Sequence, residues 1–206
     1  MIKNILFDFD GVILDSMPIR EHGFKEIFNS YKEENVDKLL KFHNINGGLS
    51  RFVKIKYFFE NILKQTITND EIESYAIKFS TIMKKELIKE KYLISNTIEF
   101  ITNHQNKYNF HIVSGSEDKE LNFLCEKLNI SNYFITINGS PTPKNNLVED
   151  LLKKYQYNKE ETILIGDSIN DHEAARINSI NSYGFNNLEL ESICDYYLYD
   201  YSDLSK

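Results

Sequence analysis

The stretch ILFDFDGVILDS, residues 5–16, combines a hydrophobic strand with acidic side chains. Its apolar residues predict a buried strand, yet Asp8 and Asp10 place two carboxylates within it. Burying an unpaired carboxylate is costly, so something must compensate both charges. This stretch therefore predicts that a polar site lies at the end of a core strand near the start of the chain.

Length and composition exclude several classes of protein. A chain of 206 residues suggests one domain with a sizeable insertion, or two small domains. The net charge of -7 argues against nucleic acid or an anionic membrane as the main partner. No apolar run approaches the ~20 residues that a membrane span needs, and the first strand leaves no room for a secretory signal. We expect a cytoplasmic monomer whose Cys125 and Cys194 stay reduced.

The pattern of apolar residues changes near residue 93. From 17 to about 92 it is helical throughout, and Thr68 to Glu71 match a capping box. After that, helical segments alternate with short strands at 110–116, 133–139, 162–168, 181–185 and 195–200.

Alternating strands and helices predict an α/β fold with a parallel sheet that is covered by helices on both faces. We predict a Rossmann-like core from residues 1–16 and 93–206, with residues 17–92 inserted as an α-helical cap domain.

Polar side chains follow several of the predicted strands. Asp8 and Asp10 come at the end of the first strand, and Asp167 and Asp171 at the end of the strand TILIGDS. Loops at the carboxyl ends of parallel strands converge, and several oxygen ligands at one point suit Mg²⁺. Capping of the next helix by Asp167 or Ser168 is the alternative, but acids in two loops of one edge favour the metal.

Two further strand ends predict an anion site. Ser114 and Gly115 follow an apolar strand, where a hydroxyl and free backbone N–H groups can bind an anion. We expect Thr142 to cap a helix with Pro143 at its first position, which sets Lys144 in the first turn. A lysine there opposes the helix dipole, so a bound anion would explain it. An exposed surface lysine is the alternative.

Together these residues resemble the haloacid dehalogenase superfamily of phosphotransferases. The signature DxDGVxxDS appears at residues 8–16 and GDxxxD at 166–171. Between them stand the serine after an apolar strand, at Ser114, and the lysine before a helix, at Lys144, in the family's order and spacing. The helical insertion is similar to the cap of the phosphoglycolate phosphatase and β-phosphoglucomutase branch.

The resemblance implies a role for each motif residue. Asp8 is implied as the nucleophile that forms an aspartyl phosphate, and Asp10 as the acid that protonates the leaving oxygen and then activates water. Because the acids outnumber the cations around a bound phosphate dianion, we expect Asp10 to be protonated. The implied Mg²⁺ site comprises Asp8, Asp10, Asp167 and Asp171, and the implied phosphate site comprises Ser114, Gly115 and Lys144.

In the cap, the sequence Gly47–Arg51 looks like the substrate loop of the β-phosphoglucomutase branch, where the arginine meets the distal part of the substrate. Arg51 is therefore a candidate substrate contact, the alternative being a cation on the helix surface. His22 lies two residues from the position of a cap histidine in that branch, and it is either a second contact or a polar residue at the hinge. Where many relatives carry Pro-Gly, this chain has Ser95 and Asn96.

These features predict a Mg²⁺-dependent phosphatase acting on a small phosphorylated metabolite through an aspartyl phosphate. A sugar phosphomutase is the first alternative, since it uses the same core and passes the phosphoryl group to a substrate hydroxyl. A non-enzymatic phospho-acceptor domain, like a response-regulator receiver, is the second. Lid shape decides the substrate, which the sequence leaves open.

Overall fold

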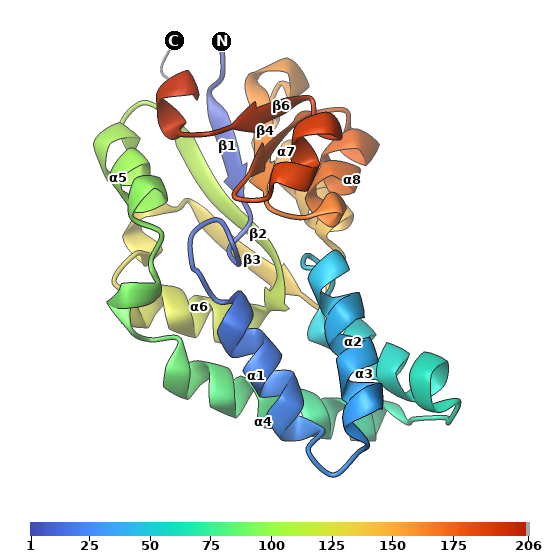
Figure 1. Ribbon diagram of the computed structural model, residues 1–206. Helices are drawn as coiled ribbons and strands as arrows, with labels where there is room; N and C mark the ends of the chain where they lie inside the picture. Colours follow the sequence, from blue (N-terminus) through green and yellow to red (C-terminus); the bar gives the residue numbers. More distant parts are fainter. Residues whose placement is uncertain (205–206) are drawn as a thin grey trace.

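The computed structural model describes residues 1–204 and contains one six-stranded parallel sheet (Figure 1). The strand order is β3-β2-β1-β4-β5-β6, so the predicted α/β fold is confirmed. The strands are β1 (Asn4–Phe7), β2 (Asn109–Glu117), β3 (Thr136–Ser140), β4 (Thr162–Gly166), β5 (Asn181–Phe185) and β6 (Tyr196–Leu198). The helices that cover this sheet are α5 (Ser95–His104), α6 (Asp118–Lys127), α7 (Lys144–Tyr155) and α8 (Ile169–Asn178).

The sheet is apolar on both faces, as the alternation along β1 shows. Ile5 and Phe7 belong to a large hydrophobic cluster that includes residues of α5 and α6. Leu6 points to the other face and joins a second cluster with residues of α7 and α8. Because successive side chains of a strand face opposite ways, a continuous apolar run is what a strand covered on both sides requires.

The segment between β1 and α5 forms a separate group of helices, which we call the lid. Its helices are α1 (Met17–Ile27), α2 (Glu33–Ile45), α3 (Arg51–Tyr57), which continues into a π-helical turn (Phe58–Leu63), and α4 (Asn69–Glu86). The lid lies beyond the carboxyl ends of β1 and β2, while the N-terminus and the last described turn, Tyr201–Leu204, lie at the opposite end of the sheet (Figure 1). The predicted capping box at Thr68 and Glu71 is present at the start of α4.

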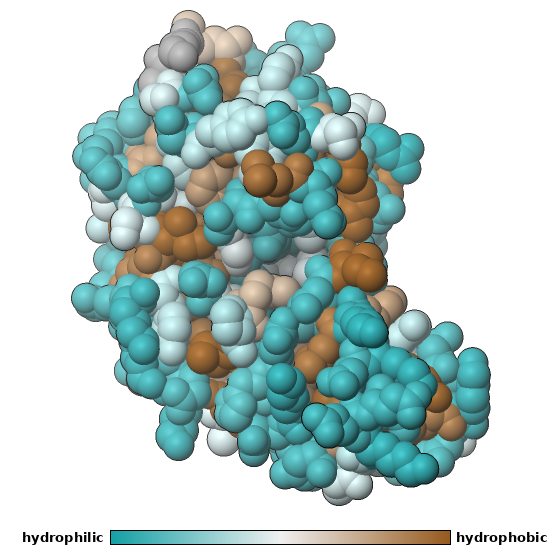
Figure 2. Space-filling view, viewed as in Figure 1, coloured by the Kyte–Doolittle hydropathy of each residue, from teal (hydrophilic) through white to brown (hydrophobic). Residues whose placement is uncertain are grey.

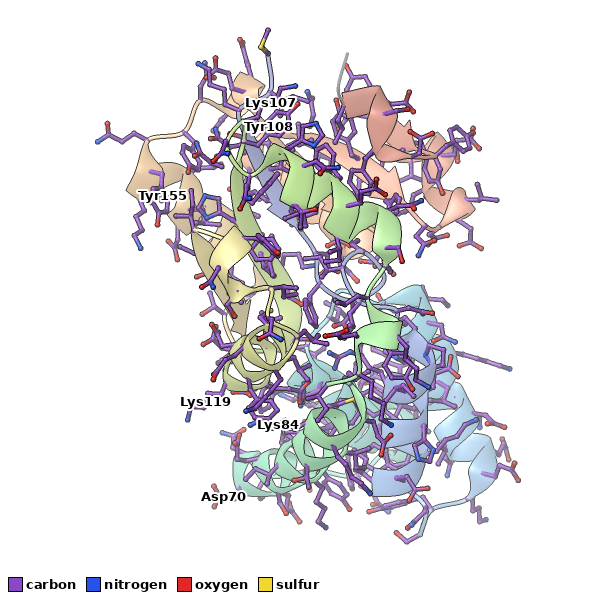
Figure 3. All side chains as sticks on the ribbon, turned by 90° about the vertical axis from the view of Figure 1, so that its left-hand side faces the viewer. Asp70, Lys84, Lys107, Tyr108, Lys119 and Tyr155 are labelled. Carbon is purple, nitrogen blue, oxygen red and sulfur yellow. The ribbon has the colours of Figure 1, made fainter. Side chains whose placement is uncertain are left out.

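The two connections between the sheet and the lid run side by side. Leu14 pairs with Leu93 in an antiparallel bridge, and the Asp15 N–H donates to the Tyr92 carbonyl at 2.7 Å. The limits of the cap domain at residues 16 and 93 stay a prediction. Helix α4 of the lid also lies beside α6, where the Lys84 ammonium stands 5.3 Å from the Phe123 ring centroid (Figure 3).

Two local expectations were wrong. Strand β2 continues past Ser114 to Glu117, which pairs with Ser140 after an irregularity in the ladder, so Ser114 and Gly115 lie within the strand and not at a helix start. Helix α7 begins at Lys144 with Pro143 as its N-cap residue, so Lys144 occupies the first helical position.

The described residues bear on two expectations, the reduced state of the cysteines and the lack of a membrane span. Cys125 and Cys194 form no disulfide, as expected. None of the helices within residues 1–204 combines the length and the apolar composition that a membrane span requires.

Candidate active site

Asp8 lies directly after β1 and is almost completely buried. Its Oδ1 is 3.0 Å from the Lys144 ammonium, and the Phe9 N–H donates to the same oxygen at 2.7 Å. Burial and the Asp171 charge raise the pKa of Asp8 to about 7, against the lowering effect of Lys144. Lys144 is itself buried, so it is no surface lysine, and β1 and α7 bring the predicted nucleophile and phosphate-binding cation into contact.

Three carboxylates meet beside Lys144. One oxygen each of Asp8, Asp167 and Asp171 lies within 4.8 Å of the others. Burial, with the charges of Asp8 and Asp171, raises the pKa of Asp167 well above its usual value. The three carboxylates carry more negative charge than Lys144 can offset, and all of their donor atoms are oxygen. The cluster therefore fits a hard divalent cation such as Mg²⁺.

Ser168, one of the two residues named as a possible cap, is the N-cap residue of α8, and Asp171 completes its capping box. The carboxylate of Asp171 accepts hydrogen bonds from the Ser168 N–H at 3.0 Å and the Ser168 hydroxyl at 2.6 Å, forming a capping box at the start of α8. Its other oxygen pairs with Lys144. Asp171 is therefore largely committed to protein partners, and Asp167 is the acid that remains free to bind a metal.

Asp10 faces the lid and has three side-chain partners. It accepts hydrogen bonds from Ser16, from Arg20 Nε at 2.5 Å and from Ser116 Oγ at 2.6 Å. Burial alone would raise the pKa of Asp10, but the Arg20 charge and these hydrogen bonds hold it below its usual value. The sequence-based charge balance left out Arg20. The expectation of a protonated Asp10 concerned the site with a phosphate dianion bound, and it stays a prediction.

A buried carboxylate of α6 joins the lid to the core. Glu120 accepts two hydrogen bonds from Arg51, both at 2.6 Å, and lies 3.3 Å from Arg20 Nη1. The Glu120 side chain has no exposed surface, and that of Arg51 is 3% exposed. Sequence reasoning missed Glu120, although its spacing of four residues from Leu124 places it on the buried face of α6. Glu120 holds together two arginines from different lid helices.

The two lid residues proposed as substrate contacts have different environments. Arg51 is no surface cation, because besides Glu120 it contacts the Ser80 hydroxyl at 2.5 Å and lies over the Phe79 ring. His22 is exposed on α1, and Arg20, two residues earlier, is the residue of this helix that reaches Asp10. Substrate contacts by Arg51 and His22 stay predictions.

The lid loop packs closely onto the phosphate-binding segment. Ser114 is buried, and its hydroxyl accepts a hydrogen bond from the Ser116 N–H at 3.1 Å. A Cβ added at Gly115 would lie 2.8 Å from the Gly48 carbonyl carbon and closer still to its oxygen. The space-filling view shows a hollow between the sheet part and the lid, with apolar side chains along it (Figure 2). Glycine at 115 thus permits the close approach of the lid.

This contact gives a prediction for Gly115→Ala. The added methyl group collides with backbone of the lid loop, which cannot move aside as a flexible side chain does, so the lid has to withdraw. We expect kcat/KM to fall about tenfold, corresponding to ~1.4 kcal/mol. Steady-state kinetics measure the loss, and thermal unfolding serves as the control for folding. Unchanged kinetics would contradict a role for this contact in turnover.

The profile of the haloacid dehalogenase-like hydrolase family matches residues 5–185. Phosphoglycolate phosphatase from Vibrio vulnificus (strain CMCP6) is 25% identical over 195 residues, which cover 89% of this chain and 83% of that protein.

Two solved structures share the fold. β-Phosphoglucomutase from Clostridium difficile has a TM-score of 0.76 at 17% identity, covering 99% of this chain and 93% of that one. The HAD-hydrolase YfnB from Bacillus subtilis, bound to magnesium, has a TM-score of 0.73 at 16% identity, covering 98% and 96%.

Proposed function

This chain belongs to the haloacid dehalogenase-like hydrolase family and is a phosphatase, and on that premise we propose that it hydrolyses a small phosphomonoester by a Mg²⁺-dependent reaction through an aspartyl phosphate. The observation that carries the proposal is the buried contact of Asp8 with Lys144, beside Asp167. A carboxylate attacks a phosphate dianion only where cations offset the repulsion between them, and this contact supplies one.

In the first step, an Asp8 oxygen bonds to phosphorus while the bond from phosphorus to the leaving oxygen breaks. Lys144 stabilises the charge on the phosphoryl oxygens, together with Ser114 and the Gly115 segment. The proton for the leaving oxygen comes from Asp10, because a dianion bound beside it raises the pKa of Asp10. In the second step Asp10, ionised again, takes a proton from a water whose oxygen bonds to phosphorus, while the bond from phosphorus to Asp8 breaks and inorganic phosphate leaves. The ion pair with Arg20 favours the ionised form needed there.

The metal belongs to the same proposal. Asp8 and Asp167 would hold Mg²⁺ through carboxylate oxygens, with the Asp10 carbonyl as a further ligand and Asp171 nearby. When bound, Mg²⁺ would neutralise charge on Asp8 and on the phosphoryl oxygens. The magnesium bound to the B. subtilis HAD-hydrolase supports this assignment at the level of the fold.

The test is release of inorganic phosphate from a panel of phosphorylated metabolites, with Mg²⁺ and with excess chelator. We expect phosphate release that needs Mg²⁺ and no bisphosphate activator. The C. difficile mutase shares the fold, so isomerisation of a sugar phosphate with little phosphate release would replace our proposal by the phosphomutase alternative. Full activity in chelator would overturn the metal assignment. Membership of a hydrolase family leaves no role for the non-enzymatic alternative.

The raised pKa values predict how Mg²⁺ changes stability with pH. The pKa of Asp8 is about 7 in the folded protein and 3.8 when unperturbed. Between these two pKa values Asp8 is protonated in the folded protein and ionised in the unfolded one. The contribution of Asp8 to the free energy of unfolding is therefore full below pH 4, and it is lost as the pH rises through 7. Mg²⁺ binds the ionised acids and offsets that loss. We expect Mg²⁺ to raise Tm by several degrees at pH 8 and hardly at pH 5, as measured by scanning calorimetry. An equal increase at both pH values would contradict metal binding at these acids.

A further inference from the structure

A cavity lies between the lid and the end of β2, and Asp10 belongs to its lining. Its volume is about 270 Å³ with open solvent included, and it is lined mainly by α1, α2, α3 and the segment Gly115–Ser116. Asp10 forms one wall, and the lid residues His43 and Lys54 line it as well. Because Asp10 serves the leaving oxygen, the part of the substrate beyond that oxygen extends into this cavity.

The cavity contains a buried cation that has no acidic partner. Arg20 and Arg51 pair with Glu120, and Arg20 also with Asp10, whereas Lys54 enters none of the ion pairs formed within residues 1–204. Lys54 is 3% exposed. Placing an ammonium ion in such a site without a counter-ion is costly. Burial and the Arg20 charge accordingly lower the pKa of Lys54 to about 7, although Asp10, Asp167 and Asp8 act to raise it.

The neutral partners of Lys54 leave hydrogen-bond donors free. The ammonium donates to the Gly47 carbonyl at 3.0 Å and lies 2.8 Å from His43 Nδ1. Burial and the Lys54 charge lower the pKa of His43 to about 2, so the ring is neutral. When Lys54 is protonated, Nδ1 accepts from its ammonium and the ring proton is on Nε2. That atom is buried and has no partner in the described part of the chain, as is also true of Arg51 Nε and Arg20 Nη2.

Within residues 1–204, Lys54 and His43 Nε2 donate to no negatively charged acceptor. Buried N–H groups are nearly always hydrogen-bonded, and each orphaned one costs free energy. Arg51 is fixed by two hydrogen bonds to Glu120, so its capacity for a ligand is small. Lys54 and His43, held by the lid alone, are the donors that remain available. An oxyanion placed among them would satisfy the hydrogen bonds and supply the missing charge.

We propose that Lys54 and His43 form an oxyanion subsite, and that the substrate is a phosphomonoester with a second anionic group, a carboxylate or a phosphate, that binds there. This inference rests on the proposed phosphatase function and assigns its substrate class. Lys54 acts away from the reacting phosphorus, so it determines specificity and does not take part in bond breaking. An alternative role for Lys54 is purely structural, as a donor to the Gly47 carbonyl and to His43.

The kinetic test compares substrates that differ at the distal group. Phosphoglycolate, ethyl phosphate and phosphoethanolamine carry a carboxylate, a methyl and an ammonium group at that position, and ethylene glycol bisphosphate carries a phosphate. We expect kcat/KM for an anionic substrate to exceed that for ethyl phosphate at least tenfold, and phosphoethanolamine to be the poorest. A preference for phosphoglycolate would identify the distal anion as a carboxylate, and a preference for the bisphosphate would identify it as a phosphate.

Variants assign the preference to the lysine. Lys54→Met keeps the volume and removes the charge, so the ratio of kcat/KM between the anionic substrate and ethyl phosphate should fall toward one. Lys54→Arg should keep a ratio well above one. Lys56→Met, on the same helix with its side chain 57% exposed, is the matched control and should not change the ratio. An unchanged ratio in Lys54→Met would overturn the proposal in favour of the structural role.

A binding measurement separates this inference from the proposed function. In Asp8→Asn protein, which should bind substrate without turning it over, calorimetry should show phosphoglycolate or the bisphosphate binding at least tenfold more tightly than ethyl phosphate. Introducing Lys54→Met into that protein should remove the difference. Selective binding without turnover of any substrate in the unsubstituted protein would refute the phosphatase function and retain the subsite. Turnover with no preference for an anion would refute the subsite alone.

Discussion

Asp8→Asn protein is expected to lose turnover by a factor on the order of 10⁴ to 10⁶, the scale on which enzymes lose activity when their nucleophile is removed. An amide cannot attack phosphorus, and it is a poorer ligand for Mg²⁺ than a carboxylate. The loss should not come from unfolding. Lys144 keeps its ion pair with Asp171, and removing a buried charge beside Asp171 relieves repulsion. Thermal stability at pH 8 should therefore be equal to or higher than that of the unsubstituted protein.

Phosphate release and single-turnover kinetics measure this effect, and Asp70→Asn is the matched control. Asp70 is exposed at the start of α4, at the outer end of the lid (Figure 3), so the same chemical change there should leave activity intact. A phosphorylated form should be trapped with the unsubstituted protein and not with the Asp8→Asn variant. Robust activity of Asp8→Asn protein would contradict the aspartyl-phosphate mechanism.

Glu120→Gln is expected to have the largest effect on stability. The amide retains the shape of the side chain but leaves Arg51 and Arg20 without their shared buried carboxylate. Removing one partner of a buried ion pair costs about 3–5 kcal/mol, because the remaining charge is uncompensated. For a chain of this size each kcal/mol lowers Tm by ~2–4 °C, so Tm should fall by roughly 6–20 °C.

Denaturant unfolding and calorimetry measure this loss, with Glu126→Gln as the control. Glu126 is exposed on the same helix, and its substitution should change the free energy of unfolding by less than about 0.5 kcal/mol. The double variant Glu120→Gln/Arg51→Met should recover part of the stability, since it removes one uncompensated guanidinium. A loss that simply adds up across the two substitutions would show that Glu120 and Arg51 do not depend on each other.

The sequence by itself determined the α/β fold and the strand-end position of the acids. Alternation within strands and capping patterns are local, so they can be recognised without knowing what packs against them. The rule that parallel strands place their carboxyl ends at one edge then brought Asp8 and Asp167 together from distant parts of the chain. The contact between Asp8 and Lys144 agrees with the motif order, although the local capping prediction for α7 was one residue off.

Only the tertiary structure determined which charges meet between the lid and the core. Arg20 and Arg51 pair with Glu120 across 100 and 69 residues of sequence, and no local pattern specifies such a partner. Nothing in the sequence indicated that Arg20 would lower the pKa of Asp10, and the burial of Lys54 cannot be recognised in a helix as short as α3. A charged side chain has the same sequence signature on a surface as in a cavity. Its energy depends on burial and on neighbouring charges, and these arise only when distant segments pack together.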